Sequence, residues 1–377
     1  MAQRDHVRLS DLDGLRRLAI EATLGIADLV EAMHRTITDA PFVVGRARSG
    51  RTRGVTGLIY KSVRGVTRVV GLGTDAIFGS LAPFARDASS SRQREAVLAA
   101  LNGVLGDHLA ETGNPLAIAM SVRKAGVPIA IARADLAAAY AQPARKVAIF
   151  VHGLCMNDLA WSRDGHDHGA ALARDLGFTP VYIHYNTGRP IVANGRELDA
   201  LLESLVREWP ARIDRLVIVG HSMGGLVARS ACDHASRLGH AWVEQLDSLV
   251  FLGTPHLGAP LERAGAWVDY LIAVSPYSAP FARLGQLRSA GIKDLRHGRA
   301  SDTGQPLPLP HGIRCYAIAA SAHRLRGDGL VPVRSAHGLA LPAARRWVAS
   351  GTGHLELLSS PAVYTRMKAW LARPRRR

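Results

Sequence analysis

The chain has 377 residues, of which 47% are hydrophobic and 21% charged, and its formal net charge is +16 at pH 7. This composition is typical of a globular protein and excludes a largely disordered chain, and no apolar run reaches the roughly 18 residues of a membrane-spanning helix. The positive charge predicts an anionic partner, unless the arginines only solvate helix faces. Because the basic runs lack interleaved aromatic residues, we do not expect this partner to be a nucleic acid.

Residues 1–142 are predicted to form a helical N-terminal extension. The first residues, MAQRDHVRLSDLDG, place charges where a signal peptide needs an apolar run, so we expect a cytoplasmic protein. Apolar positions recur at helical spacing over residues 15–37 and again from Arg92 to Glu111, with a basic linker at 46–53.

The segment 54–84 combines apolar residues with a basic stripe. Lys61, Arg64 and Arg68 fall at i, i+3 and i+7, which places them on one face of a helix. One interpretation is a peripheral helix in the membrane interface, attracted to anionic lipid. The other is a helical layer packed on the following domain, which the many glycines and β-branched residues favour. A third combines the two, as a covering layer that opens at a lipid surface.

After residue 142 the pattern changes to short apolar runs that alternate with longer helical patterns. Continuous apolar runs indicate strands that are buried on both faces, hence a parallel sheet covered by helices. We therefore predict an α/β domain over residues 143–377, with the three cysteines as small buried residues. The predicted strands are 146–151, 180–185, 215–220, 248–253, 315–320 and 345–350.

The strongest motif is a G-x-S-x-G sequence centred on Ser222. It lies between a predicted strand and a helical run, which is the context that a nucleophile elbow requires. Side chains at Gly220 or Gly224 would collide with neighbouring backbone in such a turn. The alternative is a glycine-rich turn with an inert serine. We expect Ser222 to be a nucleophile in acyl transfer. The triad of α/β-hydrolases follows the chain order Ser, acid, His, so the acid and the base are sought after Ser222.

A serine hydroxyl needs a general base, and position selects His354 among the 16 histidines. His354 follows the last predicted strand, at the sheet edge where reacting groups gather. His337 precedes that strand and is the weaker candidate. His221 flanks the nucleophile, and we expect its side chain to point away from the reacting centre.

The acid that orients the base is predicted to be Asp328, between Gly327 and Gly329 in the loop after strand 315–320. The alternative is a simple Asp-Gly turn. Asp302 lies before that strand and is the weaker candidate.

The oxyanion hole is expected to combine the backbone N–H of Met223 with that of Leu154, in the loop after the first core strand. The protein then supplies every reacting group, so we expect no metal or organic cofactor. The RDGHDHG sequence at 163–169 resembles a metal-binding loop, but it defines no complete ligand set and is predicted to be a hydrogen-bonded loop.

Five ordered motifs resemble those of the bacterial lipase-like serine esterases, and most closely the branch related to the GPI inositol-deacylases. They are VHGL at 151–154, GHSMGGLVARS at 220–230, LGTPHLGAP at 252–260, GDGLVP at 327–332 and GHLELLSSPAVY at 353–364.

The resemblance implies an α/β-hydrolase fold over roughly 145–372. It implies that the Gly253–Gly258 segment borders the acyl pocket, with His256 beside the triad, and that a cap or lid lies near 259–300. The substrate-binding residues expected at these motifs are His152, Gly153, His221, Pro255, His256 and Leu257.

We therefore expect a carboxylic-ester hydrolase that acts on small or lipid-like acyl esters. The same triad also serves thioesterases, amidases and acyltransferases. The alternative from another functional class is a binding protein on a membrane or granule surface, whose hydrolase domain mainly binds a ligand. The sequence leaves acyl chain length, stereopreference and oligomeric state open.

Overall fold

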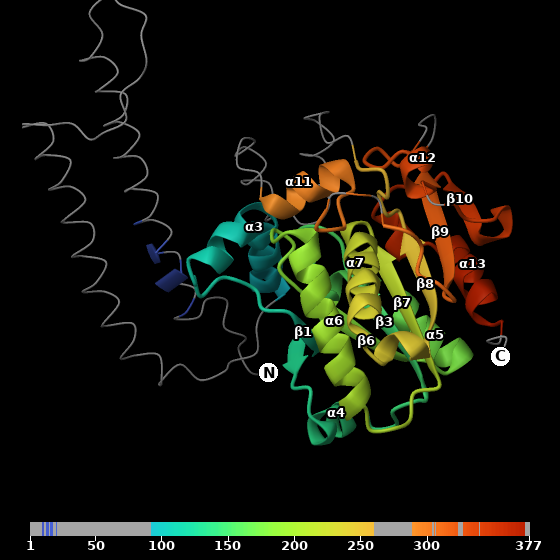
Figure 1. Cartoon of the computed structure of the whole chain (residues 1–377), viewed down its shortest axis with the longest axis horizontal. Helices are drawn as coiled ribbons and strands as arrows, with labels where there is room; N and C mark the ends of the chain where they lie inside the picture. Colours follow the sequence, from blue (N-terminus) through green and yellow to red (C-terminus); the bar gives the residue numbers. More distant parts are fainter. Residues whose placement is uncertain are drawn as a thin grey trace, which may run out of the picture. The chain divides into compact units, whose positions relative to one another are not determined.

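The computed structural model describes residues 92–259, 289–303, 305, 307–322, 327–338 and 340–373, with 10, 13, 14, 16, 17 and 20 near the N-terminus. The chain divides into two compact units, Met1–Ser89 with Gly113–Leu116, and Ser90–Thr112 with Ala117–Arg377 (Figure 1). Lys61, Arg64 and Arg68 lie outside the described residues, as does most of the predicted cap.

The second unit contains an eight-stranded sheet in the order β10-β9-β8-β7-β3-β6-β1-β2. The six strands from β10 to β6 pair in parallel, and β1 and β2 pair antiparallel at one edge. The expected α/β-hydrolase fold is therefore confirmed. The strands are β1 Ser121–Lys124, β2 Val127–Ile129, β3 Lys146–Val151, β6 Thr179–His184, β7 Arg215–His221, β8 Leu246–Leu252, β9 Arg314–Ser321 and β10 Arg346–Ser350, beside a separate two-stranded pair, β4 Ser162–Arg163 and β5 His166–Asp167.

The central strands are buried on both faces, which explains their continuous apolar sequence. Every residue of β7 and β8 is buried, and only Lys146 of β3 is exposed. Ile149, Ile218 and Leu249 lie side by side across three strands at 0% exposure. The strands predicted after residue 142 are all present, with their ends shifted by at most two residues.

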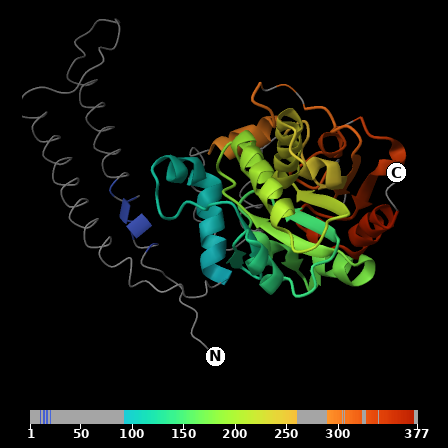
Figure 2. The ribbon, with the colours of Figure 1, turned by 60° about the horizontal axis from the view of Figure 1, so that its bottom comes forward.

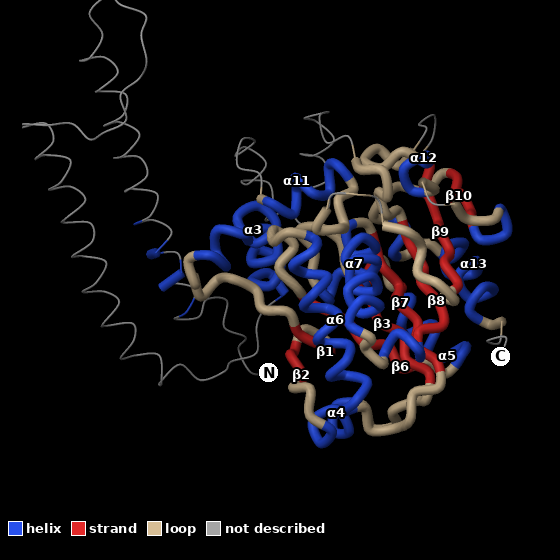
Figure 3. Tube along the Cα trace, in the orientation of Figure 1, coloured by secondary structure: helices blue, strands red, loops and turns tan. Residues whose placement is uncertain are grey.

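Helices cover both faces of the sheet (Figures 2 and 3). On one face α6, α7 and α8 pack together, and on the other α5 contacts both β6 and α13. The helix predicted from Arg92 to Glu111 is α3. None of the helices described is long and apolar enough to cross a bilayer. The helices are α3 Arg92–Glu111, α4 Arg133–Ala139, α5 His168–Leu176, α6 Ile191–Glu208, α7 Met223–Leu238, α8 Trp242–Gln245, α11 Ala290–His297, α12 Val333–Ala336 and α13 Pro361–Leu371, with short 3-10 turns η2 Asp158–Trp161, η4 Ala343–Arg345 and η5 Glu356–Leu358.

The β1–β2 hairpin lies within the stretch that is predicted to be helical. It joins the main sheet through β6, so the compact unit begins before the expected boundary at residue 142. Its two-residue turn, Ala125-Gly126, has φ values of 52° and 83°. Two positive φ values are typical of a type I′ turn, for which Asn-Gly is the recognisable sequence. Ala-Gly gives a weaker signal, and strands of four and three residues are too short to show alternation.

Candidate active site

Ser222 occupies a sharp turn between β7 and α7. Its backbone has φ 51° and ψ −122°, a conformation that L-residues rarely adopt. The turn is held from both sides, because the Ser222 N–H donates to the Leu252 carbonyl at 2.8 Å and the Gly225 N–H donates to the Ser222 carbonyl at 3.1 Å. The strand–turn–helix context expected for a nucleophile elbow is present.

Both flanking glycines are required by close backbone packing. A Cβ atom on Gly220 would lie 2.6 Å from the Gly225 Cα, and one on Gly224 would overlap the Val151 carbonyl oxygen. Backbone atoms cannot move aside as a flexible side chain can. The turn therefore tolerates no larger residue at either position.

His354 and Asp328 form a buried pair. The His354 Nδ1 lies 2.6 Å from the Asp328 Oδ2, and the two side chains are 4% and 1% exposed. The other carboxylate oxygen accepts the backbone N–H groups of Leu330, at 3.0 Å, and Val331, at 2.7 Å. Because Nδ1 donates to the carboxylate, Nε2 is left as the proton acceptor of the ring. This is the orientation that a general base needs.

The imidazole of His354 lies beside the nucleophile elbow. Gly253 directly follows Leu252, whose carbonyl accepts the Ser222 N–H. A Cβ atom on Gly253 would lie 3.1 Å from the His354 Cε1, so the imidazole packs against the residue that follows this hydrogen-bond acceptor. Ser222, Asp328 and His354 thus lie in the connections that follow the carboxyl ends of β7, β9 and β10.

The two weaker candidates lie elsewhere. His337 Nε2 is 3.1 Å from the Trp347 carbonyl oxygen, and Asp302 pairs with Arg196 at the surface at 2.6 Å. Neither is part of the buried pair.

His221 packs against the back of His354. Its ring is fully buried, and its Nε2 donates to the His354 carbonyl at 3.1 Å. Burial holds the pKa of His221 well below its usual range, so the ring is neutral. The ring therefore supports the backbone of His354.

The loop after β3 borders the nucleophile. A Cβ atom on Gly153 would lie 3.1 Å from the Ser222 Cβ. The Met156 N–H donates to the Gly153 carbonyl at 3.3 Å, which closes a turn around the fully buried Leu154. Met223 is the first residue of α7, so its N–H has no acceptor within the helix. The two expected oxyanion donors thus belong to segments that border Ser222.

His152 lies under the same loop. Its ring stacks on Tyr185 at 4.5 Å between centroids, and burial lowers the pKa of His152 to about 4. Its Nδ1 is 2.9 Å from the Gly153 carbonyl oxygen, and its own carbonyl accepts the Tyr185 hydroxyl at 2.8 Å. These contacts hold the loop from below.

A chain of buried polar side chains that the sequence does not predict continues behind His152. The His184 ring lies 5.8 Å from that of His152, and its Nδ1 lies 3.8 Å from the Asp158 carboxylate, which Arg123 approaches at 3.7 Å. Burial raises the pKa of Asp158 and lowers that of His184. Arg123 lies on β1, in the hairpin that was not predicted.

The residues of the Gly253–Gly258 segment lie in different surroundings. His256 is buried, packs edge-on against Phe251 at 4.7 Å and has its Nδ1 3.2 Å from the Arg229 Nη1. Pro255 is buried beside it, whereas Leu257 is 55% exposed. His256 thus contacts the second turn of α7 beyond Ser222, and Leu257 faces solvent.

The RDGHDHG residues form the expected hydrogen-bonded loop. Asp167 accepts the Ala170 N–H at 2.9 Å as the N-cap of α5, and His166 and His168 face each other at 2.8 Å. Asp164 accepts the Ser359 hydroxyl at 3.0 Å. Within the described residues, no group of three His, Cys, Asp or Glu side chains is arranged to hold a metal ion.

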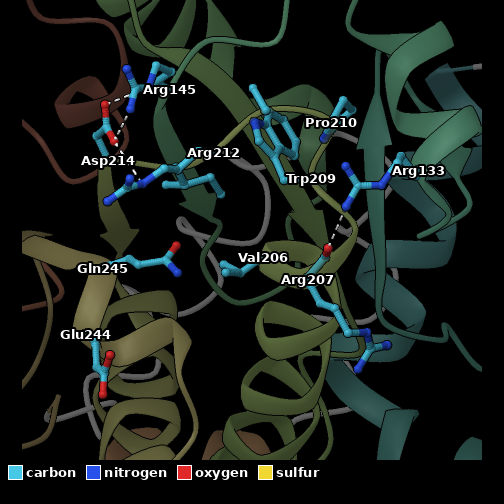
Figure 4. A pocket seen from close by; sticks show the side chains of 12 residues that line it. Arg133, Arg145, Val206, Arg207, Trp209, Pro210, Arg212, Asp214, Glu244 and Gln245 are labelled. Atoms are coloured by element: carbon cyan, nitrogen blue, oxygen red, sulfur yellow. Dashed lines mark hydrogen bonds and ion pairs between the residues drawn. The ribbon is translucent and has the colours of Figure 1, made fainter.

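A separate pocket of about 1210 Å³ lies at the amino ends of the central strands, away from the carboxyl ends that Ser222 follows (Figure 4). Apart from Arg133 at the start of α4, its lining residues directly precede β3, β7 and β8 or lie at the end of α6, and none of them is a candidate catalytic group. The arginines on its rim are largely paired within the protein, for example Arg145 with Asp214 at 2.8 Å. The pocket is lined by Arg133, Arg145, Val206, Arg207, Trp209, Pro210, Ala211, Arg212, Ile213, Asp214, Glu244 and Gln245.

A parallel sheet between two helical layers, with a serine turn of positive φ at the carboxyl ends of its strands, is the architecture of the α/β-hydrolase fold. Residues 142–279 match the family model of the PGAP1-like alpha/beta domain. Residues 142–279 are thus similar to the PGAP1-like alpha/beta domain, in agreement with the resemblance of the motifs. No curated protein matches the chain.

Solved structures of similar fold include lipases and esterases of low identity. The mature lipase BlEst2 of Bacillus licheniformis is 21% identical, with 61% of this chain and 93% of that chain covered, at a TM-score of 0.45. A lipase-esterase related protein of Clostridium acetobutylicum is 13% identical, with 60% and 94% covered and a TM-score of 0.38. The esterase Pf2001 of Pyrococcus furiosus is 17% identical, with 61% and 81% covered and a TM-score of 0.38.

Proposed function

We propose that the protein cleaves carboxylic esters through an acyl-enzyme formed on Ser222. The observation that carries this proposal is the buried hydrogen bond of 2.6 Å between His354 and Asp328 beside the strained Ser222 turn. A strained serine turn alone does not supply a base, and a His–Asp pair alone does not supply a nucleophile. Their meeting at one edge of the sheet supplies both.

In the first half-reaction the Ser222 hydroxyl oxygen attacks the ester carbonyl carbon while the His354 Nε2 takes the hydroxyl proton. The carbonyl oxygen becomes negatively charged in the tetrahedral intermediate, where the amides of Leu154 and Met223 stabilise it. His354 then gives the proton to the departing alkoxide, and the alcohol leaves.

In the second half-reaction a water molecule replaces the alcohol. His354 takes a proton from the water as it attacks the acyl carbon, and the collapse of the second intermediate returns that proton to Ser222 and releases the acid. Asp328 accepts the hydrogen bond from the His354 Nδ1 throughout and stabilises the imidazolium. Every proton in this cycle is transferred by a side chain of the protein, so the proposal includes no metal or organic cofactor.

We propose lipid-like acyl esters as the substrate class, because the motifs resemble those of lipase-like esterases. Thioester and amide cleavage and acyl transfer use the same steps and differ only in the leaving group or the acceptor. A profile over p-nitrophenyl esters from acetyl to palmitoyl, with matched thioester and amide substrates, decides among them.

Ser222→Ala tests the proposal directly. We expect loss of ester hydrolysis and of labelling by a fluorophosphonate, with an unchanged melting temperature. Ser350→Ala is the matched control, because Ser350 is exposed on β10 and contacts none of the proposed groups. Labelling of Ser222→Ala at the wild-type rate would refute the assignment, and a wild-type protein that neither hydrolyses nor labels would support a binding role.

For the N-terminal region we propose attraction to an anionic membrane surface, with Lys61, Arg64 and Arg68 as the contacting cations and a cytoplasmic location. Each cation near such a surface contributes about 1 kcal/mol, and salt weakens the attraction. Flotation with anionic and neutral vesicles tests this: binding should need anionic lipid, fall with salt and disappear when the three residues are changed to Glu. Equal flotation of that variant would contradict the proposal.

A further inference from the structure

Helix α3 lies outside the segment that matches the family model, yet it contacts the loop that borders Ser222. The match begins at residue 142, whereas α3 spans Arg92–Glu111 and belongs to the same compact unit as the sheet. The contact is centred on Cys155, which directly follows Leu154.

Cys155 has an unusual backbone conformation for its residue type. Its φ is 58°, in the left-handed region, at the third position of the turn closed by Gly153 and Met156. Glycine or asparagine normally occupies such a position, and other residues cost about 1–2 kcal/mol there. The turn therefore needs surrounding contacts to hold it, and the side chain of Cys155 is 1% exposed.

One of these contacts comes from the backbone of α3. The Cys155 Sγ lies 3.9 Å from the Ala100 carbonyl oxygen. A Cβ atom on Gly103 would overlap the Cys155 Sγ and would lie 3.2 Å from the Cys155 Cα. Glycine inside a helix costs roughly 0.5–1 kcal/mol relative to alanine, so the helix gives up stability where it meets this turn.

A second contact holds the same residue from the other side. The Cys155 N–H donates to the Thr187 hydroxyl at 3.1 Å. The loop that carries Thr187 is also anchored on α3, because the Asn186 side chain donates to the Gly106 carbonyl at 2.8 Å and a Cβ atom on Gly188 would overlap the Asn102 carbonyl oxygen. Helix α3 thus reaches Cys155 both directly and through this loop.

The start of α11 is tied to the same helix (Figure 1). The Ser289 hydroxyl donates to the Gly103 carbonyl at 2.7 Å, and the Ala290 N–H donates to the Asp107 carboxylate at 2.7 Å. Gly103 and Asp107 lie one turn apart, on the face of α3 that contacts Cys155. The helix is therefore fixed in place at the position where it touches the turn.

We propose that α3 is a positioning element of the active site, in which Gly103 lets the helix backbone hold Cys155 in its left-handed conformation and so keeps the Leu154 amide beside Ser222. This inference rests on the proposed function. It makes Gly103 a positioning residue, since the glycine acts through Cys155 and touches no reacting group.

The test uses Gly103→Ala in the full chain, measured by kcat, KM and hydrogen exchange of the peptide that covers residues 152–157. Alanine improves helix propensity, so a loss of activity cannot come from a weaker helix. We expect kcat to fall about tenfold or more, towards the ~10²–10³ loss caused by removing an oxyanion donor. KM should change little, because the amide acts mainly in the transition state. Exchange of the 152–157 amides should rise.

Two further variants make the result specific. Cys155→Ala in the Gly103→Ala background removes the Sγ that the new methyl group would overlap, so we expect partial recovery of kcat, above the product of the two single effects. Ala110→Gly, at an exposed position of the same helix, lowers helix propensity without contacting the turn and should leave kcat at the wild-type value.

Gly103→Ala with wild-type kcat and unchanged exchange at residues 152–157 would overturn the proposal. So would a fall in kcat that Cys155→Ala does not relieve. If the wild-type protein shows no hydrolysis at all, the proposed function fails, but the exchange measurement and its reversal by Cys155→Ala still decide whether α3 holds the turn.

Discussion

The His221 ring donates a hydrogen bond from Nε2 to the backbone carbonyl of His354 at 3.1 Å. The residue before the candidate nucleophile thereby fixes the backbone of the candidate base. The two rings lie 4.8 Å apart, and His221 stays neutral because burial holds its pKa well below the usual range. The elbow and the last loop of the domain are joined at this bond, so the separation of Ser222 and His354 depends on it.

His221→Phe should lower kcat/KM by about tenfold to a hundredfold, because it leaves the buried His354 carbonyl without its donor at a cost of about 1–3 kcal/mol. Phenylalanine keeps the aromatic volume, so the melting temperature should change less than the activity. Ester hydrolysis and fluorophosphonate labelling measure the effect.

His337→Phe is the matched control, since His337 makes an equivalent bond to the Trp347 carbonyl at 3.1 Å away from Ser222. It should retain activity close to that of the wild type. An equal loss in both variants would show that the effect comes from general destabilisation.

His354→Ala and Asp328→Asn should each lower kcat by several orders of magnitude, about 10⁴-fold for the Asp change. The double variant should lose little more than His354→Ala alone, because members of a triad act as a unit. Losses that multiply would contradict the assignment of Asp328 to His354, and His337→Ala as damaging as His354→Ala would transfer the base to His337.

The sequence predicts the six parallel strands and the pair of Ser222 and His354 because their signals are local. An apolar run bounded by turn residues identifies a buried strand, and a histidine after the last strand identifies the base by chain order. Asp328 follows from the same order. The structure places Asp328 and His354 in contact, which sequence order alone does not establish.

The missed features depend on contacts between distant segments. Nothing near Gly103 indicates that a left-handed cysteine 52 positions later packs against it. Arg123, Asp158 and His184 lie on three separate elements, and each is an unremarkable polar residue in its own segment. The fold brings them together behind His152, so only the three-dimensional arrangement identifies them.

The three cysteines should resist thiol reagents in the folded protein. All are buried, and burial raises the pKa of Cys155 and of Cys315 to about 12, so neither forms the reactive thiolate near neutral pH. Iodoacetamide should label none of them in buffer and all three in denaturant, as mass spectrometry of peptides would show. Rapid labelling of Cys155 in buffer would contradict the packing of its turn under α3.

His168 should make the protein less stable in acid. It is fully buried, and its Nδ1 lies 2.8 Å from the His166 Nε2. Burial lowers the pKa of His168 from the usual 6.5 to about 4. Between these values the unfolded chain binds a proton that the folded protein does not, so the free energy of unfolding should fall as pH falls from 6.5 towards 4. The slope from one such group is at most about 1.4 kcal/mol per pH unit. His168→Asn should reduce the slope of the wild type by up to that amount in urea titrations.

His240 provides the comparison of opposite sign. Its Nδ1 lies 2.7 Å from the buried Asp199 carboxylate, and this hydrogen bond raises the pKa of His240 above its usual 6.5. A raised pKa means that the folded protein holds the proton more tightly, so the stabilisation is complete below pH 6.5 and is lost as pH rises through the raised value. The difference in unfolding free energy between the wild type and His240→Asn should therefore shrink above pH 6.5, where His168→Asn has no effect on the slope. If His168→Asn and His240→Asn both changed the pH dependence of the unfolding free energy on the same side of pH 6.5, the assignment of His168 as neutral and His240 as charged would be wrong.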